Sequence, residues 1–314
     1  MKRLEEIQAS ALFREFKEFL RQSHEPAEAV AKEIAGFGEV FDSFDVHPQL
    51  SREWWFFRRL NEMDLVTVYP VLLFLYGQPE AVLPSEARIR TLDAIESYLV
   101  RRLITRSSTR SYGSIFTEVL QAAGKGDPAE ADQRIIEVLA GKTADTDVWP
   151  SDDAVQAAVL NTNIYKLRQS RLKMILEGID IFRSQNGNVE VVTLGHSLWI
   201  EHLLPQGWRE DSAWALPSSP ADRTAAAQNR DHKLHTLGNL TLTTAKLDIT
   251  MSNKPWAEKL EMLRLSTALQ LNRDLISQAP PTWDEEAIEG RGRELAADIL
   301  EIWPSAEALL EAPE

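Results

Sequence analysis

One segment of the sequence carries residue types that hydrolysis of a phosphodiester requires. Glu201 and His202 are adjacent at the end of an apolar stretch, and Asn239 and Asp248 follow further along the chain. Phosphodiester hydrolysis needs a base that activates water, a cation that neutralises the developing charge, and an in-line geometry. A histidine on a strand, an acid beside it and a polar ligand on the following helix can supply these with one metal ion. The pattern therefore favours a metal-dependent hydrolase in which His202 is the base.

The elements around these residues are predicted to follow the order strand, loop, strand, helix. Residues 198–204 form an extended apolar stretch, and residues 237–244 indicate a Gly-Asn turn that leads into a Thr/Leu strand. Ser252 is predicted to cap the next helix, with Pro255 near its first turn. Another short strand is expected at 189–194, and a long loop with at most one helical turn at 209–230. This order can fold the four polar residues into one small ββα unit around a metal ion.

The sequence before residue 185 is predicted to be mainly helical. Its apolar residues recur at three- and four-residue spacing, which is typical of helices with one buried face. The predicted helices cover residues 12–20, 54–60, 68–76, 88–104, 115–123, 133–140, 153–159 and 164–181, and a last helix is expected at 285–302.

Composition limits the class of protein. A chain of 314 residues with 44% hydrophobic and 26% charged residues is ordinary for a globular protein. No apolar run approaches the roughly 20 residues that span a bilayer, and the first residues lack the apolar stretch of a signal peptide. The chain has no cysteine, which excludes disulfides and Cys-ligated zinc. We expect a soluble, cytoplasmic protein with no membrane partner.

The net charge of −14 disfavours non-specific binding to nucleic acid. The acidic excess lies towards the two ends of the chain, whereas the middle is close to neutral. This distribution leaves room for a local DNA-binding groove with a metal ion at its base.

Three motifs together resemble one known family. Ile200-Glu-His-Leu-Leu-Pro-Gln, His235-Thr-Leu-Gly-Asn-Leu-Thr-Leu and Ser252-Asn-Lys-Pro-Trp-Ala-Glu-Lys are similar to the HNH (His-Me finger) nuclease region of GmrSD-type restriction proteins. Glu96-Ser-Tyr-Leu-Val-Arg-Arg-Leu-Ile-Thr and Trp283-Asp-Glu-Glu-Ala-Ile also resemble that family, so the likeness covers about residues 65–304. These proteins restrict modified phage DNA, and related effectors sense phosphorothioated DNA. The resemblance implies a bacterial HNH endonuclease or nickase that acts on foreign double-stranded DNA.

The resemblance also implies roles for single residues. His202 matches the general base, Glu201 the adjacent acid that binds the metal, and Asn239 the residue that braces the loop holding the site. Asp248 stands where the family more often has Asn as the second metal ligand, and Asn253 is an alternative ligand. Two carboxylates at one cation favour a single hard ion such as Mg²⁺ or Mn²⁺.

The expected fold class is mainly α with a small ββα-metal (HNH) nuclease subdomain. The expected domains are a helical domain at 1–185, the nuclease domain at 186–272, and a C-terminal helical tail at 273–314 that packs on the helical domain. The sequence has no Gly-x-x-x-x-Gly-Lys-Ser/Thr motif, so we expect no NTPase activity from this chain. The family's N-terminal NTPase or sensor domain is then expected as a separate partner, or as a part missing from this chain.

Two further histidines are candidates for a metal-binding or supporting role. His196 precedes His202 by an even number of residues, so both can point to the same side of a continuous strand. His235 is expected to pack or hydrogen-bond beside the site, with a phosphate contact as the alternative. His232 and His235 have a spacing seen in zinc sites, but without cysteine or a second pair we expect no zinc.

Basic residues that could contact the DNA backbone fall into two sets, one near the proposed metal ion and one in the helical region. The first set is Lys246, Lys254 and Lys259, and the second is Arg101, Arg102, Arg168 and Arg171. Arginine binds phosphate through a fork of donors. For the arginines, internal salt bridges in this acidic chain are an equally good interpretation.

A second hypothesis comes from a different class of function. The acidic ends and the missing NTPase domain also suit a non-catalytic adaptor, whose helical region docks a partner NTPase or sensor domain. An intact Glu-His pair followed by both Asn-containing motifs favours the enzyme.

Overall fold

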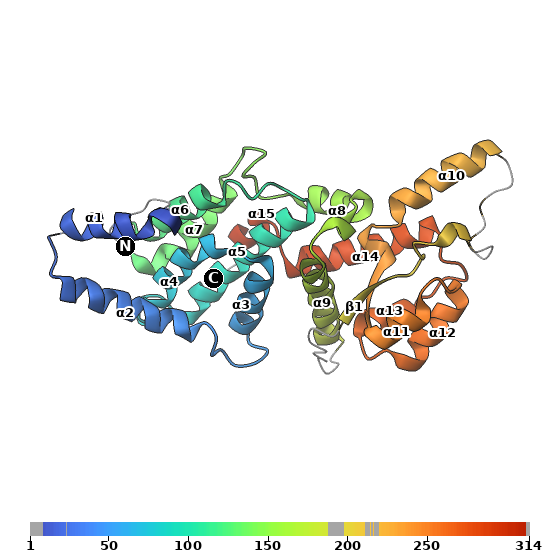
Figure 1. Ribbon diagram of the computed structural model, residues 1–314, viewed down its shortest axis with the longest axis horizontal. Coiled ribbons are helices and arrows are strands. Elements are labelled where there is room, and N and C mark those ends of the chain that lie inside the picture. Colours follow the sequence, from blue (N-terminus) through green and yellow to red (C-terminus); the bar gives the residue numbers. More distant parts are fainter. Residues whose placement is uncertain are drawn as a thin grey trace. The chain divides into compact units, whose positions relative to one another are not determined.

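The computed structural model describes residues 9–22, 24–187, 198–210, 214, 216 and 220–311. This part of the chain is mainly helical and contains one two-stranded antiparallel sheet (Figure 1). Backbone contacts divide the chain into two compact units. The first is Met1–Leu99, Ser107–Trp149 and Ala306–Glu314, and the second is Val100–Arg106 with Pro150–Ser305. The domain boundaries expected at residues 185 and 272 stay a prediction.

The first unit is built from helices, most of which bury one apolar face. They are α1 (Leu12–Gln22), α2 (Ala27–Ser43), α3 (Arg52–Met63), α4 (Tyr69–Tyr76), most of α5 (Ser85–Ile104), α6 (Tyr112–Ala123), α7 (Ala131–Ala140) and α15 (Ala306–Glu311). Helices α1 and α15 have no buried residue. Short 3-10 turns occupy Ala9–Ala11, Val66–Val68 and Pro128–Glu130. The core includes fully buried apolar residues such as Leu72, Ile95 and Val119. Apolar spacing thus predicted most of these helices, whereas α2, which buries only Val30, was not predicted.

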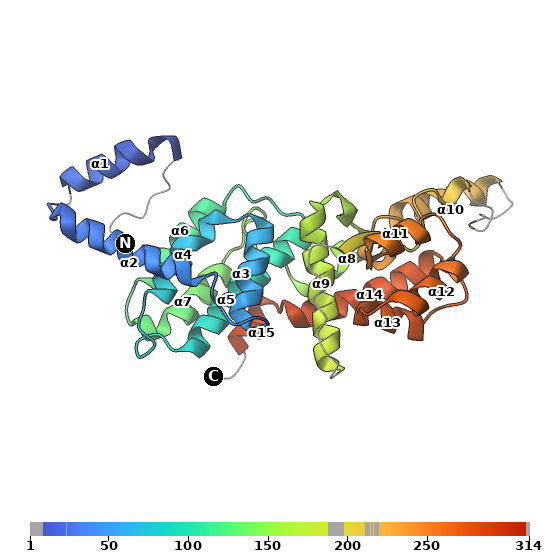
Figure 2. The ribbon, with the colours of Figure 1, turned by 60° about the horizontal axis from the view of Figure 1, so that its bottom comes forward.

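The second unit contains seven helices and both strands of the described part. They are α8 (Asp152–Asn161), α9 (Gln169–Asn186), β1 (Leu198–His202), α10 (Pro220–Lys233), β2 (Leu240–Thr244), α11 (Ala245–Met251), α12 (Trp256–Ser266), α13 (Gln270–Ser277) and α14 (Glu285–Ile302). Short 3-10 turns occupy Ile164–Lys166, Trp208–Glu210 and Leu237–Asn239. Helix α14 packs against α8, α9 and the turn before β2, and it runs across α9 in both views (Figures 1 and 2).

The two strands pair with a continuous register from Leu198 opposite Thr244 to His202 opposite Leu240. Strand β2 leads directly into α11, because the Thr244 hydroxyl accepts a hydrogen bond from the Leu247 amide and so caps that helix. The two strands agree with the prediction, whereas the helix was expected only after Ser252, so α11 was not predicted. The pairing of the strands brings the end of β1 beside the turn that precedes β2.

Three local predictions were wrong. The helix expected at 164–181 begins only at Gln169, because Leu167 and Arg168 have extended backbone. The loop expected at 209–230 contains α10, whose first residue Pro220 suits a helix start. Ser252 follows α11 at a φ of 34° instead of capping α12, which begins at Trp256. The strand expected at 189–194 lies outside the described residues. Among the residues that the structure describes, no helix is long and apolar enough to cross a membrane.

Gly238 is required where the turn before β2 touches α14. A Cβ at this position would lie 2.1 Å from the Ile288 carbonyl oxygen and 3.0 Å from the Gly292 nitrogen. Both obstacles are backbone atoms, so a small side-chain movement cannot relieve the overlap. The Gly-Asn pair before β2 is therefore set by this close approach, which only a residue without a Cβ permits.

We predict that Gly238→Ala lowers the free energy of unfolding by about 3 kcal/mol, at the upper end of overpacking costs. Gly290→Ala is the matched control. Gly290 lies on α14, the helix that Gly238 touches, and a Cβ at Gly290 meets no atom within 4 Å. The control should be neutral or raise the free energy of unfolding by up to about 1 kcal/mol. Urea unfolding followed by tryptophan fluorescence measures both. Equal effects of the two substitutions would contradict this packing.

Candidate active site

His202, the last residue of β1, is buried and lies in a cluster of three rings with the half-buried His235 and Tyr165. Its Nε2 is 3.0 Å from Nδ1 of His235. The ring of Tyr165 meets His202 edge to face, with 4.6 Å between centroids, and stacks on His235. The His235 carbonyl accepts a hydrogen bond from the Ile164 amide, which ties the turn carrying Tyr165 to this cluster. The orientation of His202 is thus fixed by segments that are distant in sequence.

The surroundings keep the His202 ring uncharged. Burial, together with the charges of His235 and Lys259, lowers the pKa of His202 to about 3. The imidazole is therefore neutral near pH 7, which is the form that accepts a proton in general-base catalysis. Its Nδ1 lies 3.4 Å from Nε2 of the exposed Gln206 side chain. Of the two ring nitrogens of His202, Nδ1 is therefore the one that lies nearest the exposed Gln206 side chain.

Glu201 forms a buried ion pair with Lys259. The Lys259 amine is fully buried and donates to Glu201 Oε1 and to the His202 carbonyl, both at 2.6 Å. Burial raises the pKa of Glu201 to about 7; Lys259 opposes this effect, whereas hydrogen bonding and charge from Asp248 add to it. Burial also lowers the pKa of Lys259. Lys259 therefore joins the carboxylate to the backbone of the neighbouring histidine.

Asp248 on α11 is half-buried and close enough to act on Glu201. The charges of both carboxylates also raise the pKa of Tyr165, after the larger effect of burial. The structure thus brings Glu201, His202 and Asp248 together. Two neighbouring carboxylates are the oxygen donors that a hard divalent cation prefers, so the donor chemistry fits Mg²⁺ or Mn²⁺. Within the described part of the chain, no group of three or more His, Asp or Glu residues is arranged to hold a metal ion.

Asn239 is fully buried and fastens the loop that follows His202. Its Oδ1 accepts hydrogen bonds from the Leu204 amide at 2.7 Å and from Trp283 Nε1 at 3.0 Å. Its Nδ2 donates to the carbonyls of Leu204 at 3.0 Å and Leu234 at 2.8 Å. The Leu203 amide also donates to the Asn239 carbonyl. These contacts have the bracing geometry that the resemblance implies for this residue.

The other polar candidates lie in different places. Asn253 is exposed, and its side chain packs against Gly207, where an added Cβ would lie 2.9 Å from Nδ2 of Asn253. It therefore lies beside the loop after His202. His196 lies outside the described residues.

The lysines near the site differ in exposure. Lys246 is exposed, and Lys254 is half-buried and paired with Glu258 at 2.8 Å. Lys259 was predicted to contact phosphate, and that prediction was wrong for this structure. Its amine is enclosed by the protein and held by Glu201, so it has no free path to DNA.

The arginines divide in the same way. Arg168 is exposed and Arg171 is half-buried. Arg101 and Arg102 are fully buried, so neither contributes to a surface that DNA can touch. Arg101 donates to the carbonyls of Trp303 and Pro150 and to the Asp152 carboxylate. For Arg101 the internal interpretation is therefore the correct one.

Three residues of the site were not assigned roles from the sequence. Gln206 and Trp283 lie within the motifs that carried the resemblance, so their positions were visible but their contacts with His202 and Asn239 were not. Tyr165 lies in a separate segment with no motif of its own, and only the folded chain brings it to His202.

Comparison with known proteins finds one family model that matches part of the chain. No curated protein matches the chain. A family model described as "GmrSD restriction endonucleases, C-terminal domain" matches residues 149–298. The match covers most of the second unit and every residue of the site described above, and it does not include the stretch at 96–105 that also resembled the family. Residues 149–298 are therefore similar to the C-terminal domain of the GmrSD restriction endonucleases.

Proposed function

We propose that this chain is an HNH-type DNA endonuclease that nicks foreign double-stranded DNA in the bacterial cytoplasm. One observation carries the proposal. A neutral His202 ends the first strand of a strand–strand–helix unit, with Glu201 and Asp248 beside it. The unit lies inside the segment that matches a restriction endonuclease family.

The proposed chemistry is hydrolysis of one phosphodiester bond. His202 takes a proton from water, and the resulting hydroxide attacks phosphorus. The bond from phosphorus to the 3′ oxygen breaks, and the leaving oxygen takes a proton from solvent, which leaves a 5′ phosphate and a 3′ hydroxyl. His235 and Tyr165 hold the ring of His202, and Asn239 holds the loop behind it. One such site cuts one strand at a time, so a double-strand break requires two sites or two encounters.

Glu201 and Asp248 are the residues that would hold a single Mg²⁺ or Mn²⁺ ion. When bound, such an ion supplies positive charge to the phosphate and to the leaving oxygen. Lys259 already provides one positive charge to Glu201 in this structure. It keeps the buried carboxylate in place beside His202.

Metal dependence is tested by nicking of supercoiled plasmid. Cleavage with Mg²⁺ or Mn²⁺ is expected to stop on addition of a chelator, and Asp248→Ala is expected to slow it by about 100-fold, because the variant loses one of the two side chains that would hold the ion. Asp222→Ala is the control, since Asp222 is an exposed carboxylate on α10. Cleavage that is unaffected by the chelator would refute the metal-dependent mechanism.

A non-catalytic adaptor is the second candidate, and the closed state of the site favours it. His202 is only 4% exposed, its Nε2 faces His235, and Lys259 covers one oxygen of Glu201. In this case the chain docks an NTPase or sensor partner without cutting DNA. Retention of a nucleotide-hydrolysing partner on the immobilised chain, with no cleavage under any divalent metal, would support the adaptor over the enzyme.

A further inference from the structure

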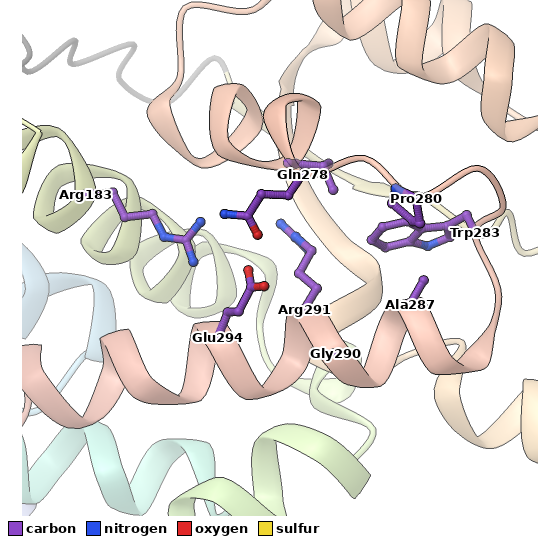
Figure 3. Close-up of a pocket in the computed structure, with 9 residues that line it drawn as sticks. Arg183, Gln278, Pro280, Trp283, Ala287, Gly290, Arg291 and Glu294 are labelled. Carbon is purple, nitrogen blue, oxygen red and sulfur yellow. The ribbon is translucent and has the colours of Figure 1, made fainter.

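A pocket lies between α9, α13, α14 and the loop that joins the last two helices. It holds about 540 Å³ of empty space, including its opening to solvent. Figure 3 shows that its lining is divided. The side chains of Arg183, Gln278, Arg291 and Glu294 converge at one end, whereas Trp283 and Pro280 form the other. The pocket therefore offers a charged end and a flat apolar end.

Arg291 carries a donor that the protein does not satisfy. Its side chain is 6% exposed, and Nη1 donates to the carbonyls of Gly238 at 2.8 Å and Leu240 at 2.7 Å. Nη2 is buried and has no hydrogen-bond partner among the described residues. A buried donor without an acceptor costs free energy. An oxygen atom of a ligand in the adjoining pocket would remove that cost.

The other charges at this end leave Arg291 as the main recognition group. Arg183 is already paired with Asp298 at 2.7 Å and Asp274 at 3.2 Å. Glu294 is exposed and lies at the same end (Figure 3). Because Arg183 is paired with those two aspartates, Arg291 and Glu294 are the lining charges that a ligand at this end would meet.

We propose that this pocket binds a small molecule with an oxyanion head and a flat apolar body. Arg291 takes the carboxylate or phosphate oxygen, with the Gln278 amide beside it. The apolar body lies against Trp283 and Pro280. This site is separate from the one that contains His202, and its occupancy is measured without reference to DNA cleavage.

Two residues that line the pocket, Trp283 and Arg291, also hold the turn that contains Asn239. Trp283 donates to Asn239, and Arg291 donates to the carbonyls on either side of Asn239, those of Gly238 and Leu240. A ligand that fixes Trp283 and Arg291 also fixes the turn they hold. Binding is therefore expected to slow amide hydrogen exchange in residues 237–244.

The test uses three probes in calorimetric titrations of the full chain: inorganic phosphate, phenyl phosphate and benzoate. Phenyl phosphate is expected to bind at least tenfold more tightly than inorganic phosphate, because only the former reaches the apolar end. The comparison of phenyl phosphate with benzoate distinguishes a phosphate head from a carboxylate head. Glu294→Gln removes a negative charge from the pocket and is expected to tighten binding several-fold.

Gly290→Leu is the blocking variant, because Gly290 lines the pocket and a Cβ there meets no atom within 4 Å. It should weaken phenyl phosphate binding at least tenfold and abolish the change in hydrogen exchange, without lowering the melting temperature. Gly36→Leu is the matched control, since Gly36 lies in α2 and is equally open at its Cβ position. Absence of binding to the wild type, or equal binding by Gly290→Leu, would overturn the proposal.

Discussion

The Asn239→Ala variant is expected to lose about 3–5 kcal/mol of unfolding free energy. The substitution removes both the acceptor and the donor of one buried amide, which leaves the Leu204 amide, Trp283 Nε1 and the carbonyls of Leu204 and Leu234 without a partner. Each buried polar group left unsatisfied costs about 1–3 kcal/mol, and some of these groups will recover water. The loss should be concentrated in the second unit, to which all of these residues belong.

Two further variants test whether the hydrogen bonds of Asn239, rather than the loss of any asparagine side chain, account for this effect. Asn239→Asp keeps the shape but replaces the Nδ2 donor with an oxygen that faces two carbonyls, so it should be nearly as damaging. Asn253→Ala removes an exposed asparagine and should change stability by less than about 1 kcal/mol. Denaturant unfolding and hydrogen exchange of residues 203–204 measure these effects. If the Asn239→Ala protein were as stable as the Asn253→Ala protein, the hydrogen bonds of Asn239 would not hold the loop that follows His202.

Lys259→Met is expected to lower the free energy of unfolding by about 3–5 kcal/mol, the usual cost of removing one partner of a buried ion pair. The substitution leaves Glu201 buried beside Asp248 with no positive charge on it. It also removes the donor to the His202 carbonyl. The end of β1 should therefore loosen.

The loss should be partly reversed when the stranded charge is removed. In Lys259→Met with Glu201→Gln, the neutral amide has no charge to desolvate, so the double variant should be more stable than Lys259→Met alone. The coupling energy from this cycle is expected to exceed about 1 kcal/mol. Lys246→Met is the control, because Lys246 is an exposed lysine on α11. Additive effects of the two substitutions would contradict a buried Glu201–Lys259 pair.

The sequence predicted best those elements whose apolar residues follow a regular pattern along a short stretch. The apolar spacing at 88–104 and 285–302 predicted α5 and α14 to within a few residues, because one face of each helix is buried. The extended apolar stretch at 198–204 and the Thr/Leu run after the Gly-Asn turn at 237–244 predicted β1 and β2. Helix α10 was missed, because its sequence is polar and rich in Ala without an apolar stripe. Helix α13 was missed as well, because its eight residues are too few to show a period.

The site was predicted unevenly for a related reason. Glu201, His202, Asn239 and Asp248 lie in motifs whose order can be read along the chain, and the structure brings them together. Tyr165 was not predicted, because its contact with His202 depends on how distant segments pack. Lys259 was visible only as a charge, and a sequence does not show whether a lysine points to solvent or into the core. The role of Lys259 as the buried partner of Glu201 follows only from the fold.

The role of His202 is tested most directly by nicking of supercoiled plasmid by the wild type and by His202→Ala, with Mg²⁺ or Mn²⁺ present. The purified variant must first show the same unfolding transition as the wild type. We predict that the wild type converts the plasmid to the nicked form, and that His202→Ala is slower by about 1000-fold or more, because no base takes the proton from water. A folded His202→Ala protein that nicks DNA at the wild-type rate would contradict the assignment of His202 as the base.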